Sequence, residues 1–126
     1  MQFSLLLHYP EPAPGDIPDD VMQETQAAFA EYARSLDDAG VLVSSPDVLQ
    51  PSVASTTVTL KNGTAEVQDG PFADSRDQLG GIFVISVPDL DAALTWAEKC
   101  PAARFGTIEV RPSAITYRDG QWAPPQ

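Results

Sequence analysis

The six-residue run from Ile82 to Val87, IFVISV, limits the folds open to this chain more than any other segment. Side chains alternate between the two faces of a strand, so Ile82 and Val84 point one way. Phe83, Ile85 and Val87 then point the other way. Both faces of the strand are apolar, and each needs a covering layer. Any fold for this chain has to supply two such layers.

Two amphipathic helices and three further strands accompany this run. Apolar residues recur at steps of three and four over Pro18–Asp38, which predicts a long helix with Gly40 in its C-terminal cap. A second helix is predicted over Leu90–Lys99, with Asp89 as its N-cap and Pro101 as its stop. The three further strands are predicted over Phe3–Tyr9, Val41–Ser45 and Thr107–Arg111.

A β-hairpin is predicted between the second of these strands and the central run. Thr56–Leu60 and Thr64–Gln68 are rich in β-branched residues and flank Asn62-Gly63, a pair that favours a two-residue turn. Without the hairpin, the elements follow the βαββαβ order of ferredoxin-like α+β domains. We therefore predict a single α+β domain over residues 1–112, followed by a loosely held tail over residues 113–126.

The second covering layer has to come from outside this chain. Two helices can cover only one face of a four-stranded sheet, whereas the run from Ile82 to Val87 is apolar on both. A second copy of the chain is the simplest cover. We predict a homodimer with the two sheets packed face to face.

Composition excludes several classes of protein. The net charge of −11 would repel nucleic acid and anionic membranes, so neither is expected as a partner. No run approaches the roughly 20 apolar residues of a membrane span, and the opening MQFSLLLHYP lacks the basic region of a signal peptide. Cys100 is the single cysteine, which fits a cytoplasmic protein. The eight acids between Glu11 and Asp38 form either a solvated helix face, which we favour, or a surface for a basic partner.

The segment QDGPFADSRDQLGG, residues 68–81, is the strongest candidate for a functional loop. Asp69-Gly70-Pro71 consists of residues that favour a turn, and Phe72 is expected to point inward from that turn. One interpretation is a structural plug, with Phe72 filling the end of the barrel and Asp69 capping the turn; residue types alone favour it. The other is a ligand pocket. Its lining residues would be Asp69, Phe72, Asp74, Arg76 and Gln78.

His8 and Asp69 are the candidates for acid–base catalysis. His8 is the single histidine and ends the first predicted strand, where an imidazole could transfer protons near neutral pH. A pair between His8 and Asp69 would require the strand order to bring them together. The alternative is a strand-end histidine bonded to backbone. One His and one Cys do not make a four-ligand zinc site, and no phosphate-loop motif is present, so no metal or cofactor is predicted.

At the same loop, the run DGPFADSRDQLGG resembles the DGPF proteins, a branch of the YCII-related family. The resemblance extends from FSLLLHY to TIEVRP. It implies a dimeric α+β barrel, a largely uncharacterised bacterial family, and an extracytoplasmic-function sigma factor as a partner. Related YCII proteins carry a helix histidine proposed as half of an acid–base pair. That position falls at about Phe29 here, and Phe cannot transfer protons.

Three functions follow from these residues. The first, which we favour, is a small-molecule-binding or regulatory dimer with its pocket at the DGPF loop. The second is an enzyme that uses His8 or Asp69 on a small organic substrate. The third is a structural module that binds another protein. Fold alone does not choose between them.

Overall fold

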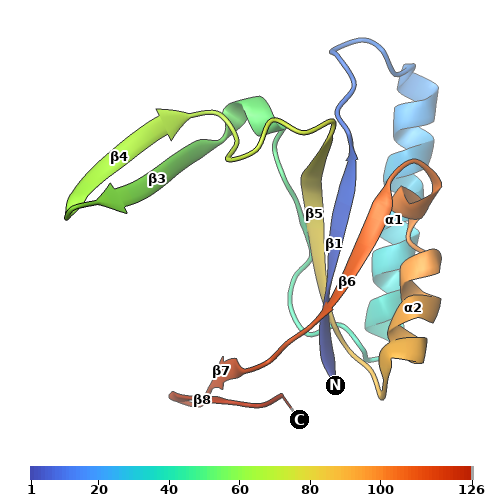
Figure 1. Cartoon of the computed structure of the whole chain (residues 1–126). Coiled ribbons are helices and arrows are strands. Elements are labelled where there is room, and N and C mark those ends of the chain that lie inside the picture. Colours follow the sequence, from blue (N-terminus) through green and yellow to red (C-terminus); the bar gives the residue numbers. More distant parts are fainter. Residues whose placement is uncertain (126) are drawn as a thin grey trace.

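The computed structural model describes residues 1–125, in which two helices pack against one face of a four-stranded antiparallel sheet (Figure 1). The sheet and helix elements are β1 (Gln2–Pro10), α1 (Asp19–Asp38), β2 (Asp47–Val48), β5 (Asp77–Ser86), α2 (Leu90–Glu98) and β6 (Thr107–Pro112). Two separate hairpins are formed by β3 (Thr56–Lys61) with β4 (Thr64–Asp69) and by β7 (Thr116–Arg118) with β8 (Gln121–Ala123). Short 3₁₀ turns lie at η1 (Ser52–Ala54) and η2 (Pro101–Arg104). The predicted α+β class is confirmed.

The sheet has the strand order β2-β5-β1-β6, with the two long strands at its centre. β5 begins earlier than predicted and runs through the glycine pair. Leu7 lies opposite Gly81 and His8 lies opposite Leu79, so Gly80 is an extra residue on β5. This insertion is a β-bulge, a feature that glycine accommodates and that bends the strand locally.

The predicted strand over Val41–Ser45 is wrong in its extent. The segment makes one isolated bridge, between Leu42 and Ile85, and the Val43 N–H donates to the Val84 carbonyl at 2.9 Å. β2 follows instead at Asp47–Val48, beyond the end of the predicted strand. The edge segment bends between these two contacts, where Pro46 has no N–H to give to a ladder.

The core lies between the sheet and the helices. Alternate residues of β1 and β5 face the helices and are buried, and Tyr32 packs its ring 5.3 Å from that of Phe83. The Tyr32 hydroxyl donates to the Trp96 carbonyl at 2.8 Å, which joins the two helices. The buried core residues are Phe3, Leu5, Leu7, Tyr32, Leu36, Phe83, Ile85, Val87, Ala93, Ala97, Cys100 and Ala102.

The predicted helix caps are confirmed. α1 ends in a Schellman motif, in which Gly40 has a φ of 72° and the Val41 N–H donates to the Leu36 carbonyl at 3.2 Å. At the start of α2, the Asp89 side chain accepts a hydrogen bond from the Ala92 N–H at 2.9 Å. Within residues 1–125, neither helix is apolar enough over its length to cross a membrane.

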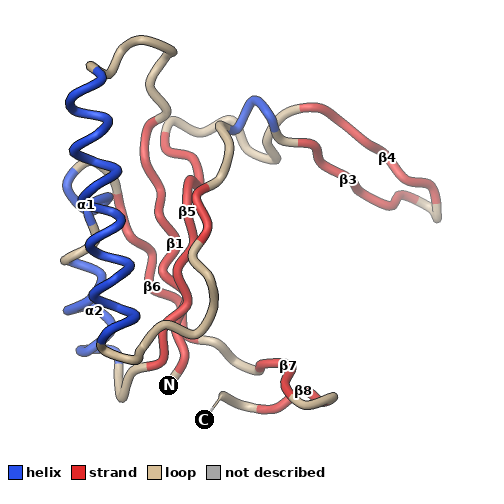
Figure 2. Tube along the Cα trace, turned by 180° about the vertical axis from the view of Figure 1, so that it is seen from behind, coloured by secondary structure: helices blue, strands red, loops and turns tan. Residues whose placement is uncertain are grey.

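Both hairpins project from the side of the sheet that faces away from the helices (Figures 1 and 2). β3 and β4 are joined at Asn62-Gly63, whose positive φ values fit the predicted turn. Within the predicted tail, Thr116–Arg118 and Gln121–Ala123 form the second hairpin, with a turn at Asp119-Gly120. The loose attachment of the tail stays a prediction. The last residue, 126, lies outside the described part of the chain. Among residues 1–125, no helix covers the sheet between the two hairpins.

Candidate functional site

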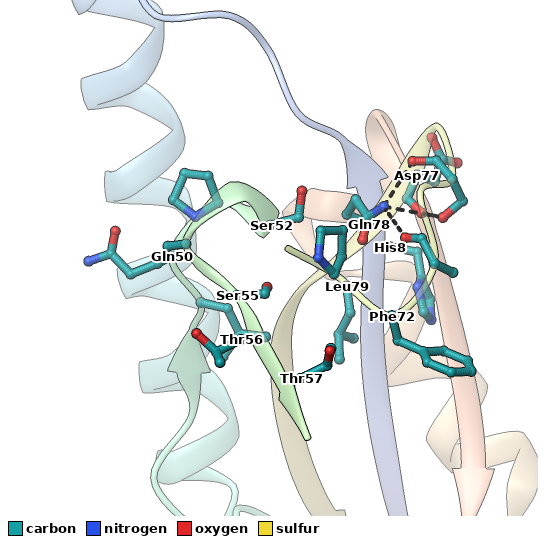
Figure 3. Close-up of a pocket in the computed structure, with 16 residues that line it drawn as sticks. His8, Gln50, Ser52, Ser55, Thr56, Thr57, Phe72, Asp77, Gln78 and Leu79 are labelled. Atoms are coloured by element: carbon teal, nitrogen blue, oxygen red, sulfur yellow. Dashed lines mark hydrogen bonds between the residues drawn. The ribbon is translucent and has the colours of Figure 1, made fainter. Parts of the chain in front are cut away.

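A cavity of about 640 Å³ lies where the end of β1, the turn η1 and the DGPF loop meet (Figure 3). The start of β3 contributes Thr56 and Thr57 to its wall, and the loop contributes Phe72 and Gln78. His8 reaches the cavity from β1. Three segments that are far apart in the sequence therefore build one concave site.

Side-chain hydrogen bonds brace the DGPF loop. The Gln78 amide donates from Nε2 to the carbonyls of Ala73 at 2.8 Å and Ser75 at 3.0 Å. At the start of the loop, Gly70 has a φ of 102° and its N–H donates to the Ser55 carbonyl at 2.7 Å. Between Ala73 and Leu79 the loop contains bends and the start of β5 but no helical turn. The Gln78 side chain and the hydrogen bond between Gly70 and Ser55, next to η1, hold the loop in this conformation.

The turn η1 is anchored by Glu11, a residue that sequence reasoning did not single out. The Ser52 N–H donates to Glu11 Oε2 at 2.6 Å, and the Ser52 hydroxyl donates to the other oxygen of the same carboxylate. This bidentate contact links the proline-rich loop after β1 to the wall of the cavity. The contact crosses 41 residues of sequence, so no local pattern could have indicated it.

Asp77 is the acid of the cavity wall. Its Oδ1 atom is buried and accepts no hydrogen bond within residues 1–125. The Arg76 guanidinium lies 3.7 Å from that oxygen and is itself 85% exposed, which makes it a weak, solvent-screened partner. A buried acceptor without a donor is costly, and a ligand that donates a hydrogen bond would relieve that cost.

His8 is held by a carboxylate from the neighbouring strand. Its Nε2 atom lies 3.0 Å from Oε1 of Glu109, and the Arg111 guanidinium donates to the other oxygen of Glu109. The hydrogen bonds from Arg111 and then His8 hold the pKa of the Glu109 carboxyl below its usual value. The side chains of His8 and Glu109 are 30% and 37% exposed. The imidazole is therefore oriented and still accessible.

The predicted site residues separate into two groups. His8, Phe72 and Gln78 line the cavity, whereas Asp69, Asp74 and Arg76 do not. Asp69 lies at the exposed end of β4 opposite Thr56, and no hydrogen bond or ion pair joins it to His8 within the described chain. The functional roles of these residues stay predictions.

The inward orientation expected for Phe72 is wrong, because its side chain is 97% exposed. Tyr9 fills the end of the sheet instead. Its ring packs 5.4 Å from that of Phe105, and its hydroxyl donates to the Gly80 carbonyl at 3.1 Å. Phe72 follows Gly70-Pro71 and lines the cavity together with His8, which alternates with Tyr9 on β1. The plug interpretation therefore does not hold for Phe72 within this chain.

Comparison with known proteins identifies the family. Residues 1–114 match the YCII-related domain, which is most of the chain. The chain belongs to the YCII-related family. A protein of Rhizobium meliloti (strain 1021), named only as an uncharacterised protein, is 39% identical over 75 residues. That alignment covers 58% of this chain and 60% of the relative, so the chain matches less than two thirds of the relative's length.

The YCII-related fold here has no acid–base residue at the helix position discussed above. Phe29 takes that place and packs, partly buried, against the hydrophobic core. Among residues 1–125, no three His, Cys, Asp or Glu side chains come together as a metal site. The chemistry available at the cavity is that of His8, Asp77 and the amide and hydroxyl groups around them. The sigma-factor partner implied by the resemblance stays a prediction.

Proposed function

We propose that this YCII-related protein is a small-molecule-binding homodimer of ferredoxin-like subunits, with the ligand seated in the cavity beside the DGPF loop. The observation that carries the proposal is the placement of Asp77, whose buried oxygen lacks a hydrogen-bond donor at the wall of a braced cavity. The Asp77 side chain as a whole is 37% exposed, so a small turn of the carboxylate would bring this oxygen to a ligand donor in the cavity.

The size and construction of the cavity support ligand binding. Its volume of about 640 Å³ falls within the usual range of small-molecule sites. Gln78 holds the loop by two backbone contacts, so little loop ordering is needed when a ligand enters. Ser52 and Thr57 supply hydroxyl groups around the same space. The site thus combines a fixed frame with several polar contacts.

The charges of the lining favour a neutral or cationic ligand that donates hydrogen bonds. Among the residues that line the cavity, Asp77 and His8 are the ionisable ones, and neither lysine nor arginine is among them. The chain as a whole carries a net charge of −11, which adds a negative field. The exposed ring of Phe72 at the mouth suits an apolar group or an ammonium group. Small amines and polyols are therefore the first ligands to test.

The dimer is supported by the uncovered face of the sheet. Leu6 and Ile82 lie opposite each other on that face, with Val84 next along β5, and all three are only partly buried. The strand order β6-β1-β5-β2, with both helices on the other face, is compatible with a ferredoxin-like subunit. An apolar sheet face of this kind suits face-to-face packing with a second copy.

A ligand screen tests the binding site. We would measure thermal shifts and ligand-observed NMR with three matched sets of small molecules, which are amines, neutral polyols and carboxylates. We expect hits among the amines or polyols, with affinity reduced about tenfold or more in Asp77→Asn. Asp74→Asn is the matched control, because Asp74 is in the same loop and does not line the cavity. Equal losses in both variants, or hits confined to carboxylates, would contradict the proposal.

An enzyme is the second candidate function, and the contact between His8 and Glu109 favours it. A histidine oriented by a carboxylate at a cavity wall can act as a general acid or base. Its test is a turnover assay on the ligands found above. Loss of turnover in His8→Gln with unchanged stability and ligand affinity would establish catalysis. Turnover that survives the substitution would exclude His8 as the catalytic residue, and the absence of turnover on every ligand would leave binding as the function.

A further inference from the structure

The β3–β4 hairpin has one polar face and one apolar face. Cross-strand pairing places Val58 opposite Val67 and Leu60 opposite Ala65 on one face. The pairs that alternate with these two belong to the other face. They are polar: Thr57 with Gln68, Thr59 with Glu66, and Lys61 with Thr64. Such alternation is typical of strands with one face buried and one face in water.

In the described chain, the apolar face of this hairpin is not covered. Val58, Leu60 and Val67 are 67%, 72% and 64% exposed. β3 and β4 form a two-stranded sheet of their own, and an isolated hairpin is marginally stable in water. The alternating pattern therefore predicts a buried apolar face, whereas this face is exposed in the described chain. Packing against another surface would bury it.

The hairpin stands out from the same side as the uncovered sheet face. Figures 1 and 2 show it projecting from one end of the sheet, opposite the helices, while β7–β8 projects from the other end. β7–β8 also exposes apolar side chains, since Tyr117 and Trp122 are 59% and 66% exposed. These two rings pack together 5.4 Å apart. The two hairpins thus flank the uncovered face, and a body seated on that face would lie between them.

We propose that the β3–β4 hairpin is an arm that packs its apolar face on a second copy of this chain. The inference rests on the homodimer proposed above and adds the contact that the arm makes in it. A second copy is favoured as the occupant because the hairpin projects from the same side of the molecule as the uncovered sheet face, where the proposed dimer would form (Figures 1 and 2). A two-fold pair contains two arms, so the same contact forms twice and stabilises the dimer at two places.

The arm also carries a wall of the ligand cavity. Thr56 and Thr57, the first residues of β3, line the cavity, and Gly70 after β4 is bonded to Ser55 in the same wall. Seating the arm on the partner fixes that wall. Ligand binding and assembly are then linked, and linkage is reciprocal: a ligand that prefers the seated arm strengthens the dimer.

The test compares lysine substitutions on the two faces of one strand. Val58→Lys adds a charge to the apolar face, and Thr59→Lys adds the same charge to the polar face one residue away. Sedimentation equilibrium should give a dissociation constant of the dimer raised about tenfold or more in Val58→Lys. In Thr59→Lys the change should stay within about twofold. Circular dichroism verifies that each variant is folded.

Hydrogen exchange on the unmodified protein provides a second, independent readout. The β3–β4 amides should exchange slowly in the dimer and faster on dilution below its dissociation constant. A dimer whose hairpin amides exchange as fast as in the monomer would contradict the proposed contact of the hairpin but not the homodimer. Equal dissociation constants of the two lysine variants would do the same. A monomer at all accessible concentrations overturns the arm and the homodimer together. The ligand site is still judged separately by Asp77→Asn.

Discussion

The phenol of Tyr9 lies where the side chain of any larger residue at position 80 would have to go. A β-carbon added to Gly80 would be 2.2 Å from Cζ of Tyr9, and the Tyr9 hydroxyl donates to the Gly80 carbonyl. The bulge in β5, the ring of Tyr9 and the end of the DGPF loop therefore form one packed unit.

We expect Gly80→Ala to lower the free energy of unfolding by roughly 1–2 kcal/mol, because the ring of Tyr9 has to move away from Phe105. Gly106→Ala should cost more, roughly 2–3 kcal/mol, since its β-carbon would lie 2.2 Å from the backbone oxygen of His8, which is fixed in the sheet. Urea unfolding of both variants measures the difference. The explanation fails if Gly106→Ala is the milder substitution.

The Glu109 carboxylate should make stability depend on acid pH. Its pKa in the folded protein is lowered by Arg111 and His8 from an ordinary value of 4.5. The resulting stabilisation is complete above that value and is lost as the pH falls through the lower, folded pKa. The difference in melting temperature between the unmodified protein and Glu109→Gln should therefore be constant above about pH 5.5 and shrink below about pH 4.5.

The control for this pH profile is Glu24→Gln, which removes an exposed acid of α1 that takes part in none of the ion pairs within residues 1–125. Its difference from the unmodified protein should change little over the same pH range. A Glu109→Gln difference that grows toward acid pH would contradict the assignment.

Gln78→Ala should loosen the DGPF loop without unfolding the domain. The substitution removes two hydrogen bonds that hold residues 73 and 75, each typically worth about 1 kcal/mol. We expect amide exchange in residues 71–77 to accelerate about tenfold or more while the core of the sheet is unaffected. Gln50→Ala is the matched control, because Gln50 lines the same cavity from the segment before η1. A similar acceleration of loop amide exchange in both variants would show that the Gln78 hydrogen bonds do not stabilise the loop.

The thiol of Cys100 should report on unfolding. Its side chain is 1% exposed, and burial raises the pKa of the thiol above its ordinary value. Reaction with a thiol reagent such as DTNB at pH 8 should be slow in buffer and fast in urea, where the core opens. A thiol that reacts in native buffer as quickly as it does in urea would show that this part of the core is open.

Local chemical signals predicted much of the fold. The cap at Gly40, the turn at Asn62-Gly63 and the N-cap at Asp89 depend on residues within a few positions of each other, and all three are confirmed. The β7–β8 hairpin carried the same kind of signal, aromatic residues around Asp119-Gly120, and was overlooked in the tail.

The site was less accessible from sequence because its contacts cross between distant segments. His8 meets Glu109 only through the register of β1 with β6, and Glu11 meets Ser52 across a loop. Phe72 is exposed at the cavity, and nothing in the order of residues 69–72 fixed that orientation. The DGPF motif located the loop correctly at a cavity wall, whereas the partner of His8 and the unpaired oxygen of Asp77 required coordinates.

The acidic outer surface of α1 has a consequence for the proposed dimer. Its exposed carboxylates point away from the sheet: Asp19, Asp20, Glu24, Glu31, Asp37 and Asp38. A face-to-face pair would carry one such negatively charged helix layer on each of its two outer sides. Two pairs that approach each other by these layers repel. In the proposed dimer, the same helix that covers the core on its inner face would end growth at a closed pair and oppose stacking into longer assemblies.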